Sequence, residues 1–178
     1  MEAEMKNDKV VKLIFAALTA AAVCIATAMV SIPLPIGYAN LGDAVILLGA
    51  GMLGPVFGAA AAGIGASLAD LFAGFPQYIP ATFIIKALMA VVFCLLIKAM
   101  FQKLNQTLSA AIAALCCELI MVAGYYLYES VVLSYGFGGA LAGVTGNLLQ
   151  GAVATVICTA FYRVCILLCE RLSAKNKR

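Results

Sequence analysis

Long apolar stretches alternate along the chain with short segments rich in Gly, Pro and polar residues. Most of the stretches approach or exceed the roughly 20 helical residues that cross the hydrocarbon core of a bilayer. The pattern predicts an all-α polytopic membrane protein with six transmembrane helices in a single domain, 1–178. The expected helices cover about 10–31, 42–53, 56–72, 80–101, 107–133 and 140 to beyond 163.

The breaks between the apolar stretches predict how these helices connect. Pro33 ends the first helix, because Pro and the residue before it resist helical conformation. Gly54-Pro55 separates two short, Gly-rich segments, which indicates close helix packing or incomplete spanning. The sixth helix is longer than a bilayer, so we expect its basic end to emerge as an interfacial helix. The turn-rich connections are 33–43, 73–82 and 134–139.

Ten of the eleven Lys and Arg residues lie in three short clusters. The clusters are Lys6, Lys9 and Lys12, then Lys98 and Lys103, and finally Arg163, Arg171, Lys175, Lys177 and Arg178. Basic residues collect at the cytoplasmic ends of membrane helices. We therefore expect both termini and the loop after the fourth helix to be cytoplasmic, and the three turn-rich connections to lie outside the cell membrane of a prokaryote.

Composition narrows the class of protein further. A chain that is 65% hydrophobic and 11% charged is not an ordinary soluble domain. Its net charge of +3 comes from the basic clusters and gives little support for a nucleic-acid partner. There is no His, and the seven Cys lie in apolar runs without a C-x-x-C pair, so we expect no metal and no cofactor. Without a nucleophile–base pair, we also expect no enzymatic activity.

Polar residues inside the predicted helices are candidates for function, because a charge in hydrocarbon is costly. At 1.5 Å per helical residue, helices four, five and six each place polar groups at similar depth in the outer half. This arrangement predicts an outward-facing ligand pocket. The turn-forming residues of the segment 33–43 suit a loop, and we expect this loop to act as a lid over the pocket. The predicted ligand-binding residues are Lys86, Glu118, Tyr125, Asn147 and Gln150, with Tyr38 and Asn40 from the lid.

Structural alternatives remain open for the same residues. In the structural alternative, Lys86 pairs with Glu118 or Glu129 in a buried salt bridge that fixes the helix register. Asn147 and Gln150 then only join helices by hydrogen bonds.

Four neighbouring residues carry alternatives of their own. Asp43 and Asp70 either contact the ligand or have structural roles. In the structural roles, Asp43 caps the second helix and Asp70 pairs with the backbone or with Lys86. Tyr38 and Tyr78 are interfacial belt residues or gate residues.

Small residues mark the first helix. Ala16 with Ala20, and Ala17 with Ala21, form overlapping Ala-x-x-x-Ala spacings. Such faces let another helix approach closely. They dock a partner subunit or pack against the chain's own helices.

Several stretches resemble the substrate-binding S components of energy-coupling factor vitamin transporters. They are GYANLGDAVILLGAGMLGP, ASLADLFAG, P-x-x-x-P-A-T-F-I-I-K (76–86) and N-L-L-Q (147–150). The resemblance implies a six-helix subunit that binds a vitamin or vitamin precursor from outside with high affinity. It also implies docking through the Ala-rich first helix onto a membrane coupling subunit, together with two cytoplasmic ATPases.

Two other functions stay open. Gly49 to Gly54 has the spacing of a phosphate-binding loop, but Pro55 replaces the required Lys, so the energy for uphill transport must come from partners or an ion gradient. The first alternative is an autonomous secondary transporter that uses Glu118 and Lys86 as an ion relay, and the second is a membrane assembly protein without a ligand. Pyridoxine-like molecules, hydroxymethylpyrimidine and riboflavin all suit the predicted pocket.

Overall fold

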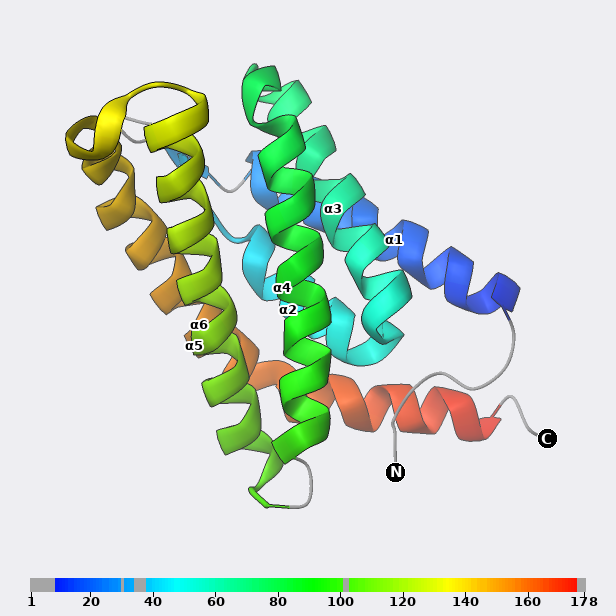
Figure 1. Cartoon of the computed structure of the whole chain (residues 1–178). Helices are drawn as coiled ribbons and strands as arrows, with labels where there is room; N and C mark the ends of the chain where they lie inside the picture. The colour runs from blue at the N-terminus through cyan, green and yellow to red at the C-terminus, as the bar shows by residue number, and fades with distance from the viewer. Residues whose placement is uncertain (1–8, 30, 34–37, 101–102, 176–178) are drawn as a thin grey trace.

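The described part of the chain folds into one helical bundle (Figure 1). The computed structural model describes residues 9–29, 31–33, 38–100 and 103–175, with side chains for 9–29, 40–100 and 103–171. The α-helices are α1 (Lys9–Met29), α2 (Gly42–Leu53), α3 (Pro55–Phe72), α4 (Ile79–Met100), α5 (Gln106–Leu127) and α6 (Gly136–Lys175). The shorter elements are β1 (Ser31–Pro33), β2 (Tyr38–Asn40), the 3-10 helix η1 (Pro76–Tyr78) and the π-helix η2 (Tyr128–Val132).

Five of these helices are long and apolar enough to cross a membrane, namely α1, α3, α4 with η1, α5 with η2, and α6. Many of their outward-facing side chains are large and apolar, such as Val56, Phe72 and Val156. Apolar side chains on the outside of a bundle suit a lipid environment, where water does not penalise them. The expected all-α polytopic membrane architecture is confirmed, with helix ends that differ from the predicted ones by a few residues.

The remaining α-helix, α2, is buried and too short to cross a membrane. Its twelve residues span about 18 Å, against a hydrocarbon core of about 30 Å. Ile46, Leu47 and Ala50 are each at most 1% exposed, because α1, α3, α4 and α6 surround them. At the C-terminal end of α2, Gly54 has a φ of 79°, and Pro55 occupies the first turn of α3. These two residues reverse the chain sharply between the helices.

Small residues allow the close packing around α2. A Cβ added at Gly58 of α3 would come within 2.8 Å of the Ala50 Cα, so α2 and α3 touch backbone to backbone. A Cβ added at Gly65, further along α3, would come still closer to the Ala20 carbonyl oxygen in α1. Close helix packing and incomplete spanning, the two interpretations of this Gly-rich region, therefore occur together.

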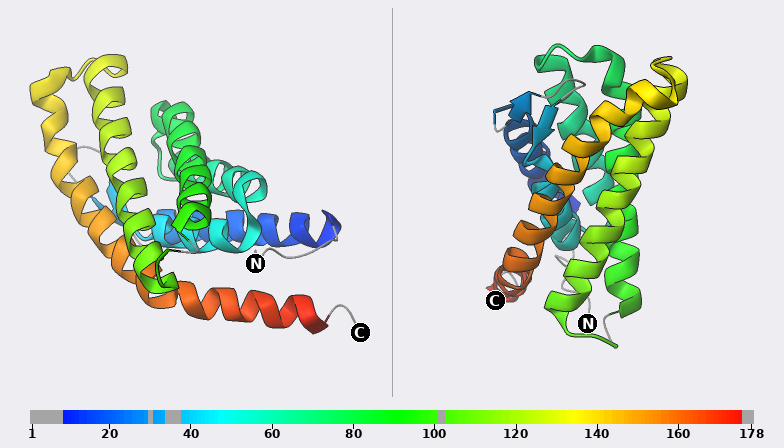
Figure 2. Two further views of the ribbon diagram at one scale, coloured as in Figure 1. Left: turned by 60° about the horizontal axis from the view of Figure 1, so that its bottom comes forward. Right: turned by 90° about the vertical axis from the view of Figure 1, so that its left-hand side faces the viewer.

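One prediction about the connections was incomplete. Within 33–43, expected only as a turn-rich connection, the chain forms strand β2, which pairs antiparallel with β1 and sets Ser31 opposite Asn40. This hairpin lies at the same end of the bundle as η1 and the start of α6, whereas the start of α5 and the end of α6 lie at the other end (Figure 2, right). The bundle thus has one end that carries the three turn-rich connections.

The 40-residue helix α6 bends near its middle, and its C-terminal half turns away from α5 (Figure 2, left). In that half, Tyr162 packs edge-on against Phe93 of α4, with ring centroids 5.7 Å apart, and fills the space beside Gly51. α1 begins and α6 ends on the right-hand side of the molecule in Figure 1. Which side faces the cytoplasm stays a prediction from the basic clusters.

Candidate functional site

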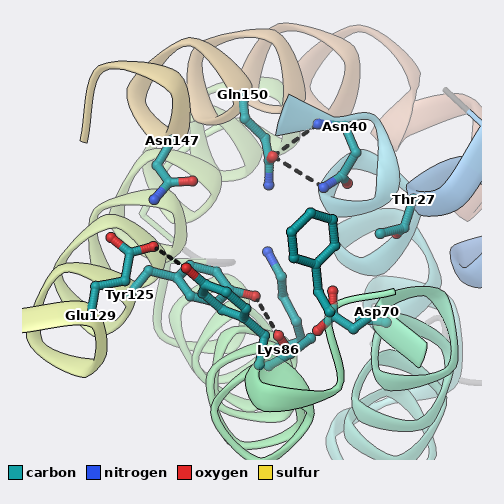
Figure 3. Close-up of a pocket in the computed structure, with 12 residues that line it drawn as sticks. Thr27, Asn40, Asp70, Lys86, Tyr125, Glu129, Asn147 and Gln150 are labelled. Carbon is teal, nitrogen blue, oxygen red and sulfur yellow. Dashed lines mark hydrogen bonds between the residues drawn. The ribbon is translucent and has the colours of Figure 1, made fainter. Parts of the chain in front are cut away.

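A polar cavity of about 40 Å³ lies between the helices near the end that carries the hairpin (Figure 3). A water molecule needs about 10–15 Å³ of such space, so the cavity holds only a few waters in this conformation. Residues from α1, β2, α3, η1, α4, α5, η2 and α6 surround it. The lining residues are Thr27, Asn40, Ala66, Asp70, Phe75, Tyr78, Thr82, Lys86, Tyr125, Glu129, Asn147 and Gln150.

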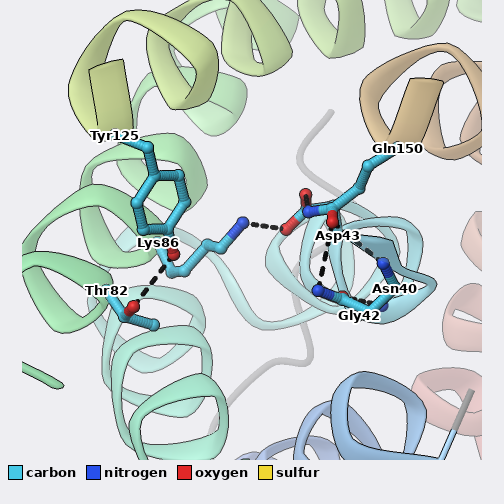
Figure 4. Close-up of polar contacts among 7 residues, drawn as sticks. All are labelled: Asn40, Gly42, Asp43, Thr82, Lys86, Tyr125 and Gln150. Carbon is cyan, nitrogen blue, oxygen red and sulfur yellow. Dashed lines mark hydrogen bonds and ion pairs between the residues drawn. The ribbon is translucent and has the colours of Figure 1, made fainter. Parts of the chain in front are cut away.

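Lys86, one of the lining residues, forms a buried ion pair with Asp43 (Figure 4). The Lys86 Nζ lies 2.5 Å from the Asp43 Oδ1, and both side chains are almost fully buried. Lys86 also lies 5.3 Å from the centre of the Tyr125 ring, close enough for a cation–π interaction. The ammonium thus has an anion and an aromatic face that together offset its loss of water.

Two of the structural alternatives left open for these residues do not hold. In the described structure Lys86 pairs with Asp43 and not with Glu118 or Glu129. Asp43 does not cap α2 through its side chain. The first backbone N–H of α2 is satisfied by Asn40 instead, because the Asn40 Oδ1 accepts a hydrogen bond of 2.8 Å from the Gly42 N–H. The carboxylate at the first turn of α2 is therefore free to turn towards α4.

Gln150 connects the ion pair to the hairpin. Its Nε2 donates to the Asp43 Oδ2 at 2.5 Å, and its Oε1 accepts from the backbone N–H and the side-chain amide of Asn40, at 2.9 and 3.1 Å. One side chain of α6 therefore holds both α2 and β2 (Figure 4). With Lys86, this gives a network that joins four elements distant in sequence.

Tyrosines form one wall of the pocket. The Tyr125 hydroxyl hydrogen-bonds with the Thr82 hydroxyl at 2.9 Å, and the Tyr78 hydroxyl donates to the Glu129 Oε1 at 3.2 Å. The Tyr78 and Tyr125 ring centroids are 6.2 Å apart. Such a wall presents flat apolar faces with polar edges, which suits a planar ligand.

Two polar groups beside this wall have unused hydrogen-bonding capacity. The Glu129 Oε2 is buried and accepts no hydrogen bond from the described residues. Asn147 lines the same side of the pocket (Figure 3) and makes no hydrogen bond to the described part of the chain. A buried polar atom without a partner is costly, so the Glu129 Oε2 needs water or a ligand, and the half-buried Asn147 amide is available to the same ligand.

Glu118 lies outside the pocket lining, although it is only 3% exposed. Neither of its carboxylate oxygens accepts a hydrogen bond from the described residues, but it is close enough to Asp43 and Lys86 to interact electrostatically with both. Gly151 of α6 leaves the space that this side chain occupies, since a Cβ there would come 2.9 Å from the Glu118 Cβ. Glu118 is thus a buried neighbour of the ion pair rather than part of the pocket surface.

The structure brings together five of the seven predicted ligand-binding residues, Asn40, Lys86, Tyr125, Asn147 and Gln150. The side chain of Tyr38 lies outside the described residues.

Sequence reasoning left six polar or aromatic residues out of the predicted site. Glu129 shares a helix face with Tyr125, and Tyr78 was considered as a gate, so both carried a signal. Thr27, Thr82 and Phe75 had none, because single hydroxyls and aromatic rings are ordinary in membrane helices. Asp70 was assigned a structural role, and it also lines the pocket.

The two Ala spacings of α1 face different ways. Ala16 is buried and packs in one cluster with Leu53, Ala61 and Cys169, and Ala20 packs beside it. Ala17 and Ala21 are exposed on the outer side of α1. Both alternatives therefore occur on one helix: one spacing packs against the chain's own helices, and the other is open to a partner.

No three Cys, Asp or Glu side chains in the described ranges come together in a way that could hold a metal ion. The described lining offers instead one cation that is already paired, two carboxylates, three amides and an aromatic wall. Such groups bind a small polar molecule through hydrogen bonds and stacking.

Comparison with known proteins assigns the chain to a family. Residues 7–165 match the family model of the ECF-type riboflavin transporter, S component. The chain is also similar to an uncharacterized protein in a gap 3′ region of Pyrococcus woesei, with 33% identity over 138 residues, 76% of this chain and 88% of that protein. The chain belongs to the ECF S component family, and the resemblance noted in its sequence is confirmed. It is therefore a membrane transport protein of a family of transporter subunits.

Proposed function

We propose that this chain binds a small vitamin or vitamin precursor with high affinity in the pocket formed by Asn40, Lys86, Tyr125, Asn147 and Gln150. The observation that carries the proposal is the pocket's partly unsatisfied polar lining within an otherwise apolar bundle. Polar groups in a membrane helix are costly, and here several elements aim them at one cavity. Pyridoxine-like molecules, hydroxymethylpyrimidine and riboflavin all have aromatic rings with polar edges that such groups can bind.

The ligand enters from outside the cell. Support comes from the three connections without Lys or Arg, which lie at the pocket end. Lys98 in the last turn of α4 and Lys103 before α5 lie at the opposite end, where α5 starts (Figure 2, right). The site of action is then the cell membrane of a prokaryote. In this orientation the hairpin, held to the pocket through Asn40 and Gln150, is the segment between the pocket and the medium.

Transport is driven by a separate module of one membrane coupling subunit and two cytoplasmic ATPases. Pro55 stands where a phosphate-binding loop requires Lys, so the chain has no ATPase loop of its own at this position. Ala17 and Ala21 give α1 an exposed small-residue face on which a partner helix can pack closely. This pair, rather than Ala16 and Ala20, is the docking face that we propose.

An autonomous ion-coupled transporter is the alternative that one observation favours. Glu118 is buried, has two unpartnered oxygens among the described residues and lies near the Lys86–Asp43 pair, as a proton-carrying group would. Uptake of ligand by this chain alone, in liposomes with an ion gradient and no ATPase, would establish that alternative and exclude the need for a coupling module.

Two measurements test the binding function. The protein is purified without added ligand, and the small molecules that co-elute are identified by mass spectrometry. Binding of that molecule is then measured for Asn147→Ala and for the control Leu148→Ala, whose side chain faces outward. A lost polar contact costs about 1–3 kcal/mol, so Asn147→Ala should bind about five- to a hundredfold more weakly and the control like the parent.

The opposite result is equally clear. If Asn147→Ala and Gln150→Ala bind like the parent but melt earlier, these amides only join helices. The pocket would then not be the ligand site.

A further inference from the structure

The charges around the pocket restrict the ligand more than its size does. Asp70 and Glu129 line the cavity, whereas Lys86 is the single basic side chain among the described lining residues. That Lys is already paired with Asp43 and stacked beside Tyr125. A ligand carrying phosphate or carboxylate would therefore enter a low-dielectric site next to carboxylates, with no free cation among the described lining residues to offset its charge.

Glu129 provides the specific acceptor. Its side chain is 3% exposed, its Oε1 is used by Tyr78, and its Oε2 lies in the pocket lining without a described hydrogen-bond donor. The Oε2 lies against Gly143 of α6, where a Cβ would come within 2.8 Å of it. Gly143 has no side chain that could donate to this oxygen, and any larger residue there would displace the carboxylate. The missing donor must come from water or from a ligand.

Asn147 lies one helical turn after Gly143 and on the same side of the pocket as Glu129 (Figure 3). An amide both donates and accepts, and a carboxylate only accepts. Together they match a ring edge on which an amino group or a protonated nitrogen donates to Glu129 and a neighbouring ring nitrogen accepts from Asn147. The aromatic wall of Tyr78 and Tyr125 provides flat faces for the ring itself.

The cavity also favours a small ring. A volume of about 40 Å³ must widen for any vitamin, and the displacement grows with each fused ring.

We propose that the ligand is a single-ring heterocycle that bears an amino group or a protonated nitrogen and no phosphate or carboxylate, and that Glu129 and Asn147 bind this amino edge. The proposal rests on the proposed vitamin-binding function and narrows its substrate class. It separates the three candidates named above, because an aminopyrimidine has the required edge and a three-ring flavin exceeds the required size.

Matched probes test the proposal on the purified full chain by calorimetry. The first pair is 4-amino-5-hydroxymethyl-2-methylpyrimidine and its 4-hydroxy counterpart, and the second is pyridoxamine and pyridoxine. In at least one pair the amino compound should bind tenfold or more tightly than its partner. Its phosphate ester should bind at least a hundredfold more weakly, and riboflavin should bind more weakly than the preferred amino compound.

Glu129→Gln keeps the size of the side chain and removes its charge. The variant should lose the preference for the amino compound, while Leu148→Ala keeps it. A merely structural role for Glu129 would lower the melting temperature or weaken both members of a pair equally, leaving the preference intact, and this result would overturn the proposal.

Other outcomes separate this proposal from the function beneath it. Tightest binding of riboflavin, of a phosphate ester, or of a co-eluting acid refutes the amino-edge proposal and leaves vitamin binding intact. If no probe binds, the co-eluting molecule decides, and one without an amino group or protonated nitrogen refutes the proposal as well. Absence of any bound small molecule, from the cell or from the probes, refutes the binding function itself.

Discussion

Removing either partner of the Lys86–Asp43 pair should destabilise the protein, but not equally. Lys86→Met leaves Asp43, which is fully buried, and the nearby Glu118 without a cation. Removing one member of a buried pair typically costs about 3–5 kcal/mol. For a chain of this size, 1 kcal/mol corresponds to about 2–4 °C in melting temperature, so Lys86→Met should melt about 6–20 °C earlier.

Asp43→Asn should cost less, because two groups still stabilise the ammonium. The Tyr125 ring stays 5.3 Å away, and Glu118 is close enough to act as a replacement anion. The amide that replaces the carboxylate in this variant can also keep a hydrogen bond to Gln150, whose Nε2 otherwise donates to Asp43. The expected loss is that of a hydrogen bond to a charged group, about 1.5–3 kcal/mol.

The double variants give the sign of each interaction. Lys86→Met with Asp43→Asn should be more stable than Lys86→Met alone, because the second change removes the uncompensated carboxylate. Asp43→Asn with Glu118→Gln should be less stable than the sum of its single changes, by about 0.5–3 kcal/mol, since the Lys then has no anion.

Unfolding can be followed with a thiol-reactive fluorescent dye, since the chain has no Trp and its buried Cys117, Cys158 and Cys169 become reactive on unfolding. Lys103→Met makes the same chemical change at an exposed position and should stay within about 0.5 kcal/mol of the parent. Equal losses for Lys86→Met and Asp43→Asn, or no rescue in the first double variant, would refute this account of the ion pair.

Three further predictions address the partner face, the helix packing and the lid. Ala17→Trp should abolish uptake in cells and leave the ligand affinity of the isolated chain within about twofold, and normal uptake would contradict docking through this face. Gly58→Ala should lower the free energy of unfolding by about 1–3 kcal/mol, because the added Cβ meets the Ala50 backbone. In the matched control Gly138→Ala the added Cβ meets nothing within 4 Å, so this variant should be slightly more stable than the parent. Equal melting temperatures of the two variants would refute the close contact. Saturating ligand should slow thiol labelling of an Asn40→Cys variant several-fold, and unchanged labelling would make 33–43 a passive connector.

The sequence predicted the helices well because their limits are set by local chemistry. The expected second helix, 42–53, coincides with α2, since Gly54-Pro55 stops one helix and starts the next by its own backbone preferences. The hairpin was missed because its strands have three residues each, too few to show a period. Short pairings of this kind depend on where the flanking helices place the chain.

The sequence predicted how deep the site residues lie in the membrane, but not which way their side chains point. Counting residues along a helix places Lys86, Glu118 and Asn147 at levels in the membrane, and the described pocket includes two of the three. The count does not say how each helix is rotated about its axis. The anion that faces Lys86 therefore came from α2, whose Asp43 looked like a helix cap.

The rotation of α1 about its axis also determines which of its small-residue faces is exposed. Both Ala spacings satisfy the same local rule, and only the tertiary packing of Gly65 and Cys169 against one side of α1 distinguishes them.

If the hairpin acts as the proposed lid, the contacts of Gln150 indicate what its movement would cost. Separating α2 from α4 would break a buried ion pair, at a cost of about 3–5 kcal/mol. Moving the hairpin breaks the two hydrogen bonds between Asn40 and the Gln150 Oε1, each worth about 0.5–1.5 kcal/mol net. The hairpin is therefore the element whose displacement costs less. When it moves, the Gln150 Nε2 stays bound to Asp43, so the side chain keeps its direction and its Oε1 becomes an open acceptor facing the ligand. A ligand donor that occupies this oxygen competes directly with Asn40. Closure of the hairpin over a bound ligand then requires Asn40 to find a new acceptor, and the ligand itself is the nearest candidate.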